Sequence, residues 1–177
     1  MFTAAVFIGL YFRFGFTVGY FIYGIFAISL IIAGIIDLRI YILPNIINIA
    51  GIAAALIISV VNGLITSSIS PVLDFFTGSV ACGIPLYIIV VLFKRGMGMG
   101  DVKFAILIGS FLGLSSGLCA LWISVVLGGV FSVIMIAAKK ATRKTLIPFG
   151  PFMVIGALAM VFSGEAIKAF LAGVYHV

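Results

Sequence analysis

The chain has 177 residues, of which 65% are hydrophobic and 8% are charged. A soluble domain carries roughly 25% charged residues, so this composition excludes a water-soluble monomer and predicts the lipid bilayer as a partner. The formal net charge is +6. Because the basic residues lie in short segments between apolar runs, they are expected to set membrane orientation, and we predict no nucleic-acid partner.

The apolar runs predict an all-α membrane protein, a bundle of about six transmembrane helices preceded by a short helix. Residues 1–12 are too short to cross a bilayer, which takes ~20 apolar residues. The expected spans lie at about 14–36, 46–64, 72–93, 104–114, 118–138 and 148–162. We expect residues 1–177 to form one transmembrane domain. Glycines inside the spans, such as Gly78, are expected to be packing positions where alanine costs little.

The basic residues alternate between the two ends of the predicted spans. One end carries eight of them: Arg39, Lys94, Arg95, Lys103, Lys139, Lys140, Arg143 and Lys144. The other end carries only Arg13 and Lys168. Basic loops stay on the cytoplasmic side, so the first end is predicted to face the cytoplasm and the C-terminus to lie outside.

Four acidic residues are present, and two of them, Asp37 and Asp101, border apolar runs at the predicted cytoplasmic end. The other two, Asp74 and Glu165, belong to the outer end. Paired carboxylates can share a proton, so that one accepts a proton from water while the other donates to a carbonyl. This is sufficient apparatus for peptide hydrolysis. Taken singly, either aspartate is equally well explained as the end of a helix.

The segment from Gly96 to Lys103 alternates glycine with other residues and contains Asp101. Alternating glycines suit a backbone that turns or approaches another backbone closely, as a protease needs when its substrate lies extended beside it. A plain glycine turn with a capping aspartate is the alternative. Two cysteines within apolar runs and a single histidine, His176, offer no metal-ligand cluster. We therefore expect no metal and no cofactor.

Several of these motifs together resemble the type IV prepilin peptidases. Gly98–Asp101 matches the GxGD signature of membrane aspartyl proteases, and Lys103 after it also fits. Asp37–Arg39 followed by Leu43–Asn45 resembles the family's other aspartate motif, and Ile147–Phe152 resembles the entry to its final helix. The resemblance covers essentially the whole chain.

The resemblance implies an aspartic-type endopeptidase with Asp37 and Asp101 as the catalytic pair. Its substrates would be prepilins or pseudopilins, which have a short basic leader followed by a hydrophobic helix. Cleavage would occur at the cytoplasmic face of the plasma (inner) membrane. The residues expected to bind substrate are Gly98, Gly100, Lys103, Pro148 and Gly150.

Two departures from the family pattern bear on this interpretation. The chain has no CxxC motif, so the methyltransferase activity of many bacterial members is not expected. Ile36 stands where the presenilin branch has a tyrosine, which favours the prepilin branch. The alternatives are a GxGD protease acting on other membrane helices, or a non-enzymatic transport or assembly subunit. Against transport, the sequence shows neither broken midplane helices nor a repeat.

Overall fold

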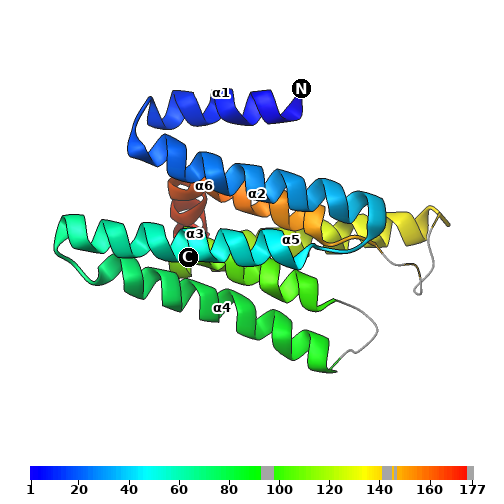
Figure 1. Cartoon of the computed structure of the whole chain (residues 1–177). Coiled ribbons are helices and arrows are strands. Elements are labelled where there is room, and N and C mark those ends of the chain that lie inside the picture. The colour runs from blue at the N-terminus through cyan, green and yellow to red at the C-terminus, as the bar shows by residue number, and fades with distance from the viewer. Residues whose placement is uncertain (93–97, 141–144, 146, 175–177) are drawn as a thin grey trace.

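The computed structural model describes residues 1–92, 98–140, 145 and 147–174. Within these residues the chain forms six helices and no strand (Figure 1). They are α1 (Phe2–Phe14), α2 (Val18–Ile40), α3 (Asn45–Thr66), α4 (Ser70–Leu92), α5 (Met99–Ala137) and α6 (Gly150–Val174). Five are long and apolar enough to cross a membrane, and α1 is the short exception. The predicted all-α membrane fold is confirmed.

Helix α5 is a hairpin of two spans. Gly113 has φ 72° and ψ −176°, which interrupts the helix. A Cβ on Gly117 would lie 3.2 Å from Cα of Gly109, whereas eight residues of straight helix would separate the two by about 12 Å. The chain therefore reverses at Gly113 (Figure 1). Its two halves correspond to the predicted spans 104–114 and 118–138.

The last helix is also interrupted, at Ser163, where φ is −132°. The Arg13 guanidinium, at the end of α1, donates a hydrogen bond to the Phe162 carbonyl just before this interruption. A carbonyl in an apolar span needs a partner when the helical bond is lost. This contact ties the short first helix to the last one, and α6 changes direction beyond it (Figure 1).

The core lies between α2, α5 and α6. Phe26 of α2 stacks on Phe111 of α5 with ring centroids 4.6 Å apart, and Leu30, Phe104 and Met153 are fully buried around them. Lipid supplies no hydrophobic driving force between helices, so close packing has to hold such a bundle together. The core thus fixes the positions of the helix ends that meet at each membrane surface.

Helix α4 packs closely on the α5 hairpin through glycines. A Cβ added to Gly78 would overlap the carbonyl oxygen of Gly109 and lie 2.8 Å from Cα of Gly113. Both neighbours are backbone atoms, which cannot rotate away. Gly78 is a packing position as expected, but the expectation that alanine there costs little is wrong.

The alternation of the helices brings the C-terminus of α2 and the N-termini of α3, α5 and α6 to one end of the bundle. Among the described basic residues, Arg39, Lys103, Lys139 and Lys140 belong to this end. Arg13 and Lys168 belong to the other, where Arg13 contacts Phe162 and Lys168 lines a cavity. The remaining basic residues, Lys94, Arg95, Arg143 and Lys144, lie outside the described residues, as does His176.

Candidate active site

Asp37 lies in the last turn of α2, which continues one turn beyond the expected end to Ile40. Its side chain is buried, with 4% of its surface exposed. One carboxylate oxygen, Oδ2, accepts a hydrogen bond from the Gly150 backbone N–H at 2.9 Å. Gly150 is the first residue of α6, so the carboxylate faces a helix N-terminus, where the unpaired N–H groups and the helix dipole favour an anion.

Asp101 lies in the first turn of α5 and is half-buried. Its Oδ2 accepts a hydrogen bond from the Gly98 N–H at 3.0 Å, while its own N–H donates to the Gly98 carbonyl at 3.1 Å. The carboxylate bond is the acidic half of a capping box, and the second bond is a backbone turn, because glycine has no side chain to accept it. Asp101 therefore caps the start of α5, and the cap fixes the direction of its carboxylate.

The two aspartates, 64 positions apart in sequence, line the same cleft of about 340 Å³. They are near enough for the charge of Asp37 to act on Asp101. The other described residues that line the cleft are Tyr41, Ile42, Leu43, Asn45, Gly98, Met99, Gly100 and Lys103. The structure thus brings the two carboxylates of the predicted pair to one cleft.

Three of the residues expected to bind substrate, Gly98, Gly100 and Lys103, line this cleft. Gly98 is exposed, and a Cβ there would meet nothing closer than 3.6 Å, so an incoming chain has room beside it. Gly100 is tighter, because a Cβ would lie 3.0 Å from Cβ of Leu43 and 3.3 Å from its carbonyl oxygen. The Lys103 ammonium donates to Asn45 Oδ1 at 2.8 Å, which joins the starts of α5 and α3.

Two further residues were expected to bind substrate, Pro148 and Gly150, and neither is among the described lining residues of the cleft. Pro148 is half-buried and precedes α6. Gly150 is buried, and a Cβ there would lie 2.7 Å from Asp37 Oδ2. Its position against the carboxylate leaves no space for a side chain, so Gly150 orients Asp37 in this structure.

Asn48 was missed by sequence reasoning. It is fully buried in α3, and its Nδ2 donates to the Gly100 carbonyl at 3.4 Å, while its Oδ1 has no partner among the described residues. The signal available was a polar amide one turn after Pro44 in an otherwise apolar run, since such groups inside a span are usually functional or structural. Asn48 of α3 is thus bonded to the backbone of the GxGD segment at Gly100.

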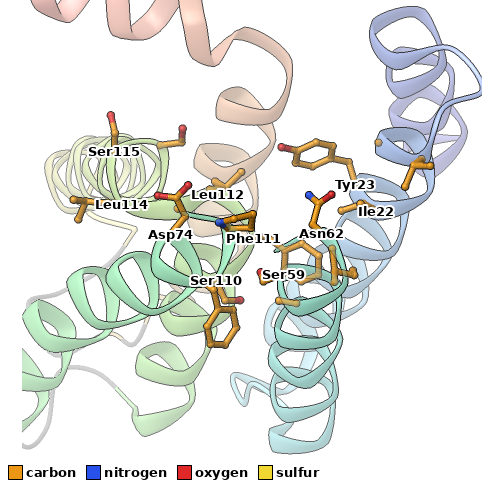
Figure 2. A pocket seen from close by; sticks show the side chains of 18 of the residues that line it. Ile22, Tyr23, Ser59, Asn62, Asp74, Ser110, Phe111, Leu112, Leu114 and Ser115 are labelled. Carbon is orange, nitrogen blue, oxygen red and sulfur yellow. The ribbon is translucent and has the colours of Figure 1, made fainter. Parts of the chain in front are cut away.

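A larger cavity, of about 730 Å³, opens at the opposite end of the bundle. Figure 2 shows Asp74, Asn62 and Tyr23 reaching toward a common space from three different helices. Ser59, Ser110, Ser115, Ser116 and Lys168 add further polar groups. Among its described lining residues, this cavity has one carboxylate, that of exposed Asp74.

Across the part of the chain that the structure describes, no three His, Cys, Asp or Glu side chains gather as metal ligands would. The two aspartates of the cleft are a pair without a third such ligand. Two carboxylates alone make a poor zinc site.

The match to a known protein family covers the segment that contains both cleft aspartates. Residues 24–133 match the model of the type IV leader peptidase family. The chain is 26% identical over 171 residues to a prepilin leader peptidase/N-methyltransferase of Bacillus subtilis, covering 95% of this chain and 66% of that protein. It is 30% identical over 146 residues to the Pseudomonas putida protein of the same name, covering 80% of this chain and 49% of that protein.

A Xanthomonas campestris protein, also called prepilin leader peptidase/N-methyltransferase, is 39% identical over 72 residues, covering 41% of this chain and 25% of that protein. The chain thus spans between a quarter and two thirds of the length of these relatives. No solved structure matches the chain. The matched family segment contains both Asp37 and Asp101.

Proposed function

Because the chain belongs to the type IV leader peptidase family, we propose that it is a membrane aspartyl endopeptidase that removes the leader of prepilins or pseudopilins at the cytoplasmic face. The observation that carries this proposal is the shared cleft. Asp37 and Asp101 come from different helices, line one cleft and are each held by a glycine N–H. No cofactor is required.

The reaction follows from a pair that holds one proton. The ionised aspartate removes a proton from water, whose oxygen attacks the scissile carbonyl carbon, while the protonated aspartate donates its proton to the carbonyl oxygen. The tetrahedral intermediate then collapses. The carbonyl reforms as one hydroxyl returns its proton to the second aspartate, the C–N bond breaks, and the first aspartate passes the proton taken from water to the leaving amine. The pair returns to its starting state with one proton.

The substrate has to be extended where it is cut, because a helical peptide bond already has its carbonyl hydrogen-bonded. Unwound backbone at membrane depth is tolerated only where protein or water satisfies it. The exposed Gly98 offers open backbone beside Asp101. The ionised carboxylate attracts a basic leader, whereas basic residues such as Arg39 suit anionic lipid headgroups.

The direct test mixes the purified protein in detergent with a prepilin and detects the released leader by mass spectrometry. We expect cleavage at a single bond near the start of the hydrophobic segment, with the same rate in EDTA. A loss of cleavage in EDTA that zinc restores would overturn the two-aspartate mechanism. A substrate that stays intact under all conditions would overturn the proposed function.

Orientation is tested separately with reporters fused at the two ends of the bundle. A reporter after Lys140, at the aspartate end, should be active only in the cytoplasm. One inserted in the turn at Ser67, at the other end, should be active only outside. The reverse pattern would put the cleft on the wrong side for a leader that remains in the cytoplasm.

A further inference from the structure

An apolar groove runs between α4 and the first half of α5, and one of its lining residues, Val102, follows Asp101 of the cleft in sequence. Its volume is about 360 Å³, and its lining residues are Ser79, Val80, Gly83, Ile84, Tyr87, Val102 and Ile106. Val102 and Ile106 follow Asp101 by one and five residues, so the groove begins at the level of that carboxylate and extends about 7 Å along α5 by the rise of an α-helix.

The walls of the groove face the surroundings of the bundle. Val80 is 53% exposed and Ile84 is 51% exposed. Between them Gly83 leaves room for the Ile106 side chain of α5, since a Cβ there would lie 2.6 Å from it. These helices are membrane spans by length and hydropathy. The groove therefore opens to lipid and suits an apolar occupant.

One buried polar atom lines the groove. Ser79 Oγ is buried and makes no hydrogen bond to any of the residues that the structure describes. The other two buried serines behave differently, because Ser110 bonds the Leu107 carbonyl and Ser124 bonds the Ala120 carbonyl. An unsatisfied buried hydroxyl costs free energy that a bound acceptor would recover. Ser79 thus marks a place where a hydrogen-bond acceptor is missing.

We propose that this groove binds the apolar helix that follows the cleavage site of the substrate, with the Ser79 hydroxyl donating to a backbone carbonyl of that helix. This inference rests on the proposed function. A helix seated here would reach the cleft at Asp101, with its extended end beside Gly98. A small residue in the bound helix would expose its carbonyl to Ser79, as small residues do in membrane helix pairs.

The test compares two substrates and a matched pair of variants. One substrate is a full prepilin in nanodiscs, and the other is a soluble leader peptide that ends shortly after the cleavage site. Ile84→Trp fills the groove, while Ile89→Trp adds the same bulk to an exposed isoleucine of α4 outside it. We expect Ile84→Trp to raise KM for the full prepilin about tenfold or more with kcat retained.

Leader-peptide cleavage should stay unchanged in Ile84→Trp, and Ile89→Trp should resemble the wild type with both substrates. Equal KM values for the full prepilin in both variants would mean that lipid alone occupies the groove, and would overturn the inference. If the wild type cleaves neither substrate, the proposed function fails instead. The two failures are therefore distinct.

Ser79→Ala provides an independent readout. Removing a hydroxyl that has no partner should leave the melting temperature unchanged or higher, while KM for the full prepilin should rise about threefold. Ser124→Ala removes a hydroxyl bonded within its own helix and should leave KM unchanged. A lower melting temperature for Ser79→Ala together with an unchanged KM would show a structural role and contradict the proposal.

Discussion

The two ends of the bundle both combine a cavity, an aspartate and a glycine turn, yet they differ in how the carboxylates are held. The far cavity is about 730 Å³ and the aspartate cleft about 340 Å³. In the larger cavity, Asp74 is exposed and is the one carboxylate among the described lining residues. In the smaller one, Asp37 and Asp101 each accept a glycine N–H. The larger cavity thus lacks the held pair of carboxylates on which the proposed reaction depends.

The carboxylates are held differently because Asp37 and Asp101 each lie at the first turn of a helix, whereas Asp74 lies beyond the first turn of its own helix. Helices α5 and α6 both begin at the aspartate end, and the first turn of a helix has N–H groups without intrahelical partners. Gly98 and Gly150 present these N–H groups to Asp101 and Asp37. Asp74 sits beyond the first turn of α4, where the N–H groups already have helical partners.

The largest effect is expected from removing either held carboxylate. Asp37→Asn and Asp101→Asn should each lower kcat by about a thousandfold or more, because neither can then exchange the shared proton. Asp74→Asn should cleave within about twofold of the wild type. Cleavage of a prepilin by the three purified variants measures this. Substantial turnover by Asp37→Asn or Asp101→Asn would contradict a shared role, and a collapse in Asp74→Asn would remove the distinction between the two ends.

The next effect concerns the orientation of Asp37. Gly150→Ala would put a Cβ 2.7 Å from Oδ2 and 3.1 Å from Cβ of Asp37, so the carboxylate has to move. A displacement of about 1 Å at a reacting group can cost about a hundredfold in rate, and we expect a loss of kcat of that order.

Gly129→Ala is the matched control for this change, since a Cβ there meets nothing within 4 Å. It should cleave normally and be slightly more stable, by about 1 kcal/mol or less, because alanine favours a helix over glycine. Equal kcat values for Gly150→Ala and Gly129→Ala would show that the contact with Gly150 does not set the position of Asp37.

A third comparison distinguishes the structural role of Gly100 from that of Gly98, the two glycines of the GxGD segment. Gly100→Val should both slow cleavage and lower the melting temperature, because the new side chain would meet Leu43 Cβ at 3.0 Å and the Leu43 carbonyl oxygen at 3.3 Å. Gly98→Ala has 3.6 Å of clearance and should keep the wild-type melting temperature. Thermal unfolding and cleavage of both variants measure this. A wild-type melting temperature for Gly100→Val would leave a substrate contact as the only reason for that glycine.

Sequence reasoning reached the fold and the aspartate pair because charge is rare in this chain. Each acidic residue interrupts an apolar run, so Asp37 and Asp101 stand out, and the basic residues indicate which end they share. The turn near Gly113 was likewise visible as a short gap between spans. All of these are local features of the sequence.

Contacts between distant segments were not accessible in the same way. Gly150 touches Asp37 across 113 positions, and only the packing of α6 on α2 brings them together. Asn48 reaches the Gly100 carbonyl for a similar reason. The tolerance expected at Gly78 was wrong because the distance between α4 and the α5 hairpin depends on backbone contact at Gly109 and Gly113, which composition does not reveal.

The smallest effect is expected at the edge of the cleft. Lys103 donates to Asn45 Oδ1 at 2.8 Å and joins the first turns of α5 and α3. An exposed charge-assisted bond of this kind contributes about 1 kcal/mol, so Lys103→Met should lower kcat/KM only about two- to fivefold. Asn45→Ala removes the same bond from the other side and should have a similar effect, with no further loss in the double variant. Additive losses of kcat/KM in the double variant would mean that Lys103 acts on the substrate directly. A non-additive result would mean that Lys103 acts only by holding α5, and with it Asp101, in position in the cleft.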